Sequence, residues 1–150
     1  MPRGTIDTRT ARPDSDPVAV FVDTVYWLAL LNRNDEWHER AVEWSARINE
    51  SLVTTEAVLT EVADALCRAD RRRWAIEAID SVRRDRAVTR ISTTARLFSD
   101  GFALYSARPD KDWSLTDCIS FVVMSQRHLD RALTADVHFT QAGFRALLRE

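Results

Sequence analysis

Two kinds of apolar pattern alternate along this chain. Short continuous runs of apolar and β-branched residues predict strands at residues 18–22, 52–54, 88–91 and 131–134. Between these runs, apolar residues recur at the spacing of one helix face, which predicts helices at 26–31, 37–48, 58–66, 74–82, 97–108 and 114–123. Residues 144–148 are expected to add a last edge strand or helix. Strands that alternate with helices indicate an α/β fold with a parallel sheet.

Length and composition indicate a single folded domain. The chain has 150 residues, of which 45% are hydrophobic and 29% charged, so a fibrous or largely disordered protein is excluded. Residues 1–17 hold three of the four prolines and no apolar periodicity. We therefore predict a disordered tail over 1–17 and one domain over 18–150. The longest apolar stretch, 18–31, contains Asp23 and is too short to span a membrane, and a cytoplasmic protein is expected.

The charge and the cysteines narrow the function classes. A formal net charge of −2 excludes a basic protein that coats nucleic acid. The two cysteines, Cys67 and Cys118, lie in apolar helical stretches and are expected to be buried free thiols. The three histidines lack the spacing of paired metal ligands, so zinc is not expected, and we interpret His138 as a structural residue.

Acidic residues stand where parallel sheets bind ligands. Asp23 follows the first predicted strand directly, and Asp136 follows the fourth, two residues after Thr134. Glu61 lies in the helix after the second strand, and Asp117 lies in the first turn of the helix that leads to the fourth. Ligands bind beyond the carboxyl ends of such strands, so these four carboxylates are expected to face one crevice. Clustered carboxylates require a cation, and oxygen ligands favour Mg²⁺ or Mn²⁺.

Each acid also has a purely structural interpretation. Asp117 completes the sequence Ser114-x-x-Asp117, which is close to a helix-capping box. Glu61 is also interpretable as a solvated charge on a helix, and Asp136 as the acceptor of a turn or cap. Asp23 is the hardest to explain in this way, because it closes a strand as apolar as VAVFV.

Four stretches of the chain hold motifs that occur together in one family: VAVFVDTVYWLALL, TTEAVLTEVADAL, SLTDCISFVVM and RALTADVHFTQAGF. With these motifs, residues 18–148 resemble the PIN-domain nucleases, and especially the VapC-type toxins of bacterial toxin–antitoxin pairs. The last stretch is the most specific, since Asp-x-His-Phe after a strand that ends in threonine is typical of that family. The resemblance implies a three-layer α/β/α fold around a parallel sheet of about five strands.

The resemblance also implies an activity and its residues. It implies a Mg²⁺- or Mn²⁺-dependent endoribonuclease, with one or two ions held by Asp23, Glu61, Asp117 and Asp136 as catalytic residues. Thr134 matches a hydroxyl position beside that site. A small antitoxin partner and a homodimer are expected, as the toxin of a type II toxin–antitoxin system. The alternative is a catalytically silent PIN module that binds RNA or protein.

A basic cluster is a candidate RNA contact. It consists of four arginines: Arg68, Arg71, Arg72 and Arg73. It is interpreted either as a solvated helix face or as a rim that binds the RNA backbone. Two phosphate-handling folds are disfavoured. A receiver domain requires a late lysine and a dehalogenase-type phosphatase requires Asp-x-Asp, whereas the only lysine here is Lys111 and Asp23 is followed by Thr24 and Val25.

Overall fold

The sheet is built around the most apolar segment of the chain. In the computed structural model, which describes residues 18–150, strand β1 (Val20–Val22) is the middle strand of five and is completely buried. The strand order is β3-β2-β1-β4-β5, and every neighbouring pair is parallel. Residues 1–17, the predicted tail, lie outside the described residues.

Strands and helices alternate as the apolar pattern predicts. The other strands are β2 (Leu52–Thr55), β3 (Val88–Ile91), β4 (Arg131–Leu133) and β5 (Arg145–Ala146). The helices are α1 (Thr24–Leu31), α2 (His38–Arg47), α3 (Glu56–Ala65), α4 (Arg72–Arg84), α5 (Ala95–Ala107), α6 (Leu115–Gln126) and α7 (Val137–Gln141). A 3₁₀ turn, Leu147–Arg149, follows β5.

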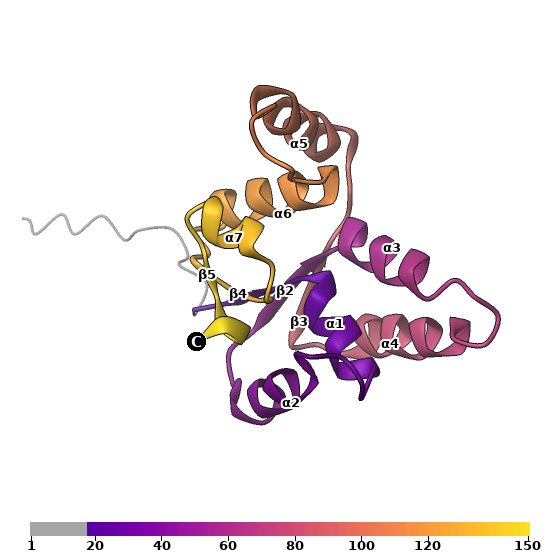
Figure 1. The fold of residues 1–150 in the computed structure, drawn as a ribbon. Helices are drawn as coiled ribbons and strands as arrows, with labels where there is room; N and C mark the ends of the chain where they lie inside the picture. Colours follow the sequence, from indigo (N-terminus) through magenta and orange to yellow (C-terminus); the bar gives the residue numbers. More distant parts are fainter. Residues whose placement is uncertain (1–17) are drawn as a thin grey trace, which may run out of the picture.

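The alternation of side chains along β1 produces a layer of helices on each face of the sheet. Successive residues of a strand point to opposite faces. Phe21 lies in a core with residues of α5, α6 and α7, whereas Val20 and Val22 lie in a second core with residues of α1 and α2. Figure 1 shows α5 and α6 on one side of the sheet and α1, α2 and α4 on the other. The predicted three-layer α/β/α fold is confirmed.

The strand order reverses its direction beside β1. The chain adds β2 and β3 on one side of β1, and then returns to add β4 and β5 on the other. In register, Phe21 pairs with Val53 of β2 and with Ala132 of β4. At such a reversal the connections leave the two neighbouring strands in opposite directions, and the space between them at the carboxyl edge is a common ligand site. Here the reversal lies between β1 and β4.

Three features differ from the sequence-based expectations or extend them. Helix α7 was not predicted, because five residues are too few to show helical periodicity. Residues 144–148 contribute both a strand, β5, and the start of the 3₁₀ turn. Cys118 is a buried free thiol as expected, but Cys67 is exposed, because it falls just after the end of α3 rather than on its apolar face.

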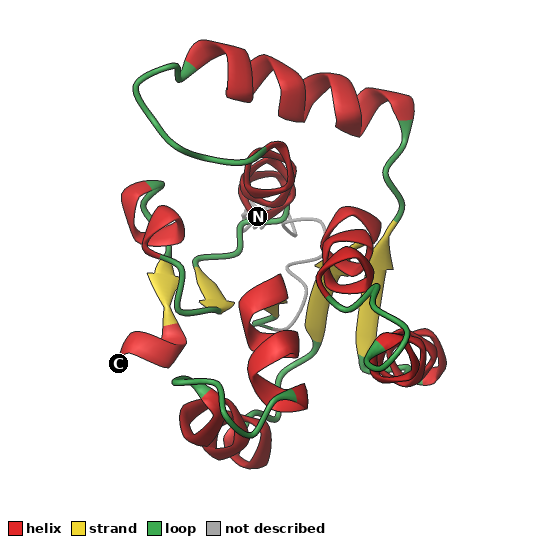
Figure 2. Ribbon diagram, turned by 45° about the vertical axis from the view of Figure 1, so that its right-hand side comes forward, coloured by secondary structure: helices red, strands yellow, loops and turns green. Residues whose placement is uncertain are grey.

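Helices α5 and α6 approach one another closely. Figure 2 shows α5 as the outermost helix, with α6 between it and the sheet. Gly101 makes this approach possible, because a Cβ atom at that position would lie 2.5 Å from Cγ1 of Ile119 and 3.3 Å from its backbone N and Cα. The α5–α6 pair matters for function, because α6 begins at the acidic residues described below.

Replacing Gly101 with alanine should destabilise the protein. Alanine gains about 1 kcal/mol of helix propensity, but overpacking against Ile119 costs about 1–3 kcal/mol, so we expect a net loss of about 1 kcal/mol in the free energy of unfolding. Urea denaturation measures the change. The matched control is Ser99→Ala on the exposed face of α5, which should be slightly stabilising. Equal stability gains in both variants would contradict the close approach.

Candidate metal centre

Asp23 is a buried carboxylate at the carboxyl end of β1. Only 3% of its surface is exposed. The Thr134 hydroxyl donates a hydrogen bond to Asp23 Oδ2 at 2.7 Å, and the backbone N–H of Asp23 bonds to the carbonyl of Leu133 at 3.3 Å. Burial raises the pKa of Asp23 to about 7, although the hydrogen bond from Thr134 lowers it. The negative charges of Asp117 and Asp136 raise this pKa further, which places three carboxylates in one neighbourhood.

Thr134 couples the ends of two strands. It follows β4 and is completely buried. Its Oγ1 accepts the backbone N–H of Asp136 at 3.0 Å while it donates its own proton to Asp23. Both roles of the hydroxyl are therefore used, and it holds the Asp23 carboxylate against the turn that carries Asp136. This is the placement expected of a hydroxyl beside the site, and its part in metal binding stays a prediction.

Asp117 caps α6 and also belongs to the acidic group. Its backbone N–H donates to Ser114 Oγ at 3.0 Å, and its Oδ2 accepts the backbone N–H of Ser114 at 3.1 Å, which completes a capping box. The same Oδ2 lies 3.0 Å from Nδ1 of His138. Burial raises the pKa of Asp117, and the hydrogen bonds from Ser114 and His138 oppose that shift. The structural interpretation of Asp117 as a helix cap is confirmed, and its role as a metal ligand stays a prediction.

Asp136 and His138 complete the group from the start of α7. Asp136 is the N-cap of α7, and its Oδ1 accepts the backbone N–H of His138 at 2.8 Å. His138 Nδ1 lies 3.4 Å from the same oxygen. One ligand atom each from Asp117, Asp136 and His138 lies within 4.8 Å of the others. Sequence reasoning did not place His138 in the site, although its position two residues after an acid at a helix start was a usable signal.

Within residues 18–150, the fourth predicted acid and the basic cluster form no hydrogen bond or ion pair with this group. Glu61 is half-buried on α3, which packs against both α1 and α6. Arg72 donates to the carbonyl of Cys67 from Nε at 3.1 Å and from Nη2 at 2.8 Å, so it fixes the turn before α4. Arg68 lies 3.5 Å from Asp70. Figure 1 places the α3–α4 connection and α7 on opposite sides of the molecule.

The functional assignments of Glu61 and of the basic cluster therefore stay predictions. Glu61 as a metal ligand stays a prediction, supported by the two helices against which α3 packs. The assignment of RNA contact to the basic cluster also stays a prediction. All four of its arginines are exposed: Arg68, Arg71, Arg72 and Arg73.

The donor set fits a divalent cation. Oδ1 of Asp117 and Oδ2 of Asp136 accept no hydrogen bond from the described residues, so each carboxylate has one fixed and one available oxygen. Within residues 18–150, no arginine or lysine forms an ion pair with Asp23, Asp117 or Asp136. The basic group that touches the last two is His138. Buried carboxylates without such partners require another counter-charge. Several oxygens with one imidazole suit Mg²⁺ or, better, Mn²⁺.

Comparison with known proteins agrees with this geometry. A profile of the PIN domain matches residues 20–145. The chain belongs to the PIN domain family. It is 30% identical over 125 residues to a Mycobacterium tuberculosis protein named 23S rRNA-specific endonuclease VapC20. The matched region covers 83% of this chain and 95% of the relative.

Solved structures show the same relationship. The crystal structure of Mycobacterium tuberculosis VapC20, described as a sarcin–ricin loop cleaving toxin, superposes with a TM-score of 0.77 at 30% identity, over 83% of this chain and 95% of that one. VapBC2 from Rickettsia felis, bound to a DNA fragment from its promoter, gives a TM-score of 0.60 at 11% identity, over 85% and 96% of the chains, which shows a shared fold. Among residues 18–150, no helix has the length and apolarity needed to cross a membrane.

Replacing Asp23 with asparagine tests its buried charge in the metal-free protein. Because the pKa rises from 3.8 unfolded to about 7 folded, the folded state keeps a proton that the unfolded state loses between these values. The free energy of unfolding therefore falls as pH rises through that range. In chelator, we expect wild type to lose about 2–3 kcal/mol between about pH 5 and about pH 8 relative to Asp23→Asn.

Urea denaturation of both proteins at the two pH values measures this difference. Asp23→Asn keeps an acceptor for the Thr134 hydroxyl and carries no charge, so it isolates the titration. A difference between the proteins that does not change with pH would contradict the raised pKa.

Proposed function

We propose that this chain is a divalent-metal-dependent endoribonuclease that acts as the toxin of a type II toxin–antitoxin pair in the cytoplasm. The observation that carries the proposal is the group of Asp117, Asp136 and His138 beside buried Asp23, at the strand reversal of a PIN domain. Mg²⁺ or Mn²⁺ is the proposed cofactor. Asp23, Asp117 and Asp136 would hold it, with Glu61 as the fourth carboxylate.

The chain's own residues have distinct tasks in this proposal. The bound ion would supply Lewis-acid assistance for phosphodiester hydrolysis and offset the charge that develops on the phosphate. Thr134 orients the Asp23 carboxylate, while His138 holds Asp117 through Nδ1 and Asp136 through its backbone N–H. The available oxygens of both aspartates are thereby directed by hydrogen bonds rather than by free rotation. This arrangement is ready for an ion at a small entropic cost.

Water is the proposed nucleophile. Cys118 is next to Asp117, but its thiol is completely buried, and burial raises its pKa. A buried thiol with a raised pKa is a poor nucleophile, because the thiolate is the reactive form. Hydrolysis by water in this family is expected to leave 5′-phosphate and 3′-hydroxyl ends.

The activity for which VapC20 is named suggests a substrate class for this chain. VapC20 is named as an endonuclease specific for 23S rRNA and as a toxin that cleaves the sarcin–ricin loop. We propose ribosomal RNA as the substrate class of this chain as well. A small antitoxin and a homodimer are the proposed protein partners, and the VapBC2 complex supports the first of these.

Cleavage of RNA tests the nuclease proposal. Full-length protein is incubated with end-labelled total RNA and with 23S rRNA in Mg²⁺ or Mn²⁺, with chelator as the negative control. We expect discrete fragments from wild type, and a loss of at least about 100-fold in Asp23→Asn, since metal assistance contributes several kcal/mol to the barrier. Equal cutting by the variant would refute the site. No cutting by either protein, with Mn²⁺ binding intact, would favour the silent binding module.

Glu61→Gln tests the fourth carboxylate separately. The substitution removes one charge and keeps the size of the side chain. We expect weaker Mn²⁺ binding and cleavage slower by at least about 10-fold, since changing a group that merely supports a metal ligand already costs about 10-fold to 100-fold. Glu77→Gln, an exposed position on α4, is the matched control and should behave as wild type. If Glu61→Gln and Glu77→Gln behave alike, Glu61 is a solvated helix charge.

A further inference from the structure

A pocket lies beside the residue that caps α6 and holds Asp117. It is an open pocket of about 860 Å³ between the end of α5 and the start of α6. Its lining includes Ser114, whose backbone N–H and hydroxyl are both hydrogen-bonded to Asp117. One residue therefore belongs to the wall of this pocket and to the support of the acidic group.

Two exposed aromatic rings line one wall of the pocket. Phe102 and Tyr105 lie one turn apart on α5 and are 52% and 48% exposed. Their ring centroids are 6.3 Å apart, with an angle of 19° between the planes. Each ring therefore offers a large apolar surface to solvent with little packing of its own. Such surfaces are the platforms on which unpaired nucleobases stack.

The opposite wall contains a buried tryptophan and two basic side chains. Trp113 is only 6% exposed, and its Nε1 donates to Gln141 Oε1 of α7 at 3.1 Å. The Arg108 guanidinium lies 5.0 Å from the centroid of the Trp113 ring and donates to both carboxylate oxygens of Asp110 at 2.9 Å. Lys111, the only lysine of the chain, forms no ion pair within residues 18–150.

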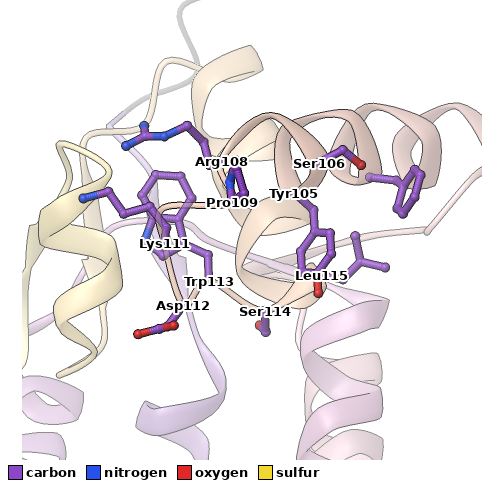
Figure 3. Close-up of a pocket in the computed structure, with 10 residues that line it drawn as sticks. Tyr105, Ser106, Arg108, Pro109, Lys111, Asp112, Trp113, Ser114 and Leu115 are labelled. Carbon is purple, nitrogen blue, oxygen red and sulfur yellow. The ribbon is translucent and has the colours of Figure 1, made fainter.

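Figure 3 shows how these groups are arranged. Trp113 and Lys111 lie on one side of the pocket and Tyr105 and Leu115 on the other, with Ser114 between them at the bottom. The side chain of Asp112, which also lines the pocket, is turned away from Tyr105. The Lys111 side chain extends from the Trp113 side of the pocket, away from Tyr105.

We propose that this pocket binds an unpaired base of single-stranded RNA next to the phosphate that is cleaved. The base stacks on Tyr105, with Phe102 extending the platform, and Lys111 pairs with a neighbouring backbone phosphate. The proposal rests on the proposed nuclease function, because it gives the pocket the nucleotide that flanks the acidic group. RNA is the occupant that uses all three features together: the aromatic surface, the unpaired cation and the continuity with Asp117.

Fluorescence anisotropy with labelled oligouridine and oligoadenosine tests the pocket without any cleavage. Full-length protein is titrated in EDTA, so that metal-dependent hydrolysis does not occur. We expect Tyr105→Ala to weaken binding about 5-fold to 150-fold and Tyr105→Phe to retain it, because only the ring is needed for stacking. Phe98→Ala is the matched control, since Phe98 is 50% exposed on the same helix but lies outside the pocket.

Lys111→Gln tests the phosphate contact independently. We expect weaker binding and a salt dependence reduced by about 0.7 in the slope of log affinity against log salt, which is the signature of one lost phosphate contact on a single strand. If Lys111→Gln binds RNA with the affinity and the salt dependence of wild type, this part of the proposal is overturned.

The results of the binding and cleavage experiments distinguish a failure of the pocket proposal from a failure of the nuclease proposal. If wild type binds RNA, Tyr105→Ala does not, and no protein cleaves RNA, the pocket stands and the nuclease proposal falls. If wild type cleaves RNA and Tyr105→Ala binds and cleaves as Phe98→Ala does, the pocket proposal is overturned. A changed molecular mass or a lost antitoxin complex in Tyr105→Ala, with RNA binding intact, would make this face a protein interface and also overturn it.

Discussion

The structure depends on one costly interaction, a carboxylate buried among other carboxylates. Asp23 follows a strand whose side chains are all removed from water, and two further aspartates raise its pKa. The Thr134 hydroxyl compensates only part of the cost of this burial. A fold that keeps such an arrangement sacrifices stability at that position, and buried acids of this kind gather where a cation is bound.

The topology brings the acidic group together from distant parts of the chain. Thr134 and Asp23 are 111 residues apart in sequence, yet their side chains share a short hydrogen bond because β4 pairs directly with β1. Asp117 arrives on α6, which the closely packed α5 covers from outside. The start of α7 then connects the two sides, since His138 touches Asp117 while Gln141 of the same helix holds Trp113. The acidic group and the aromatic pocket therefore share one framework.

The sequence predicted the sheet and the grouping of three aspartates for a simple reason. Continuous apolar runs indicate buried parallel strands, and acids directly after such strands must lie at one edge of the sheet, which located Asp23 and Asp136. Helix α7 and the place of His138 were beyond this reasoning, because a five-residue helix leaves no periodic pattern. The pocket was also beyond it, since its shape depends on how the connection from α5 turns before Ser114. The structure locates Glu61 and the four arginines, but within residues 18–150 it shows no hydrogen bond or ion pair between them and the aspartates.

The most direct test of the central claim is to locate a bound ion. Crystals of the full-length protein grown with Mn²⁺, with anomalous diffraction measured at the manganese edge, show where the ion lies. We expect one or two anomalous peaks about 2 Å from carboxylate oxygens of Asp23, Asp117 and Asp136. Crystals of Asp23→Asn grown in the same way should show a weaker peak or none. Saturating Mn²⁺ that gives no peak at these aspartates, or a peak elsewhere only, would contradict the metal centre.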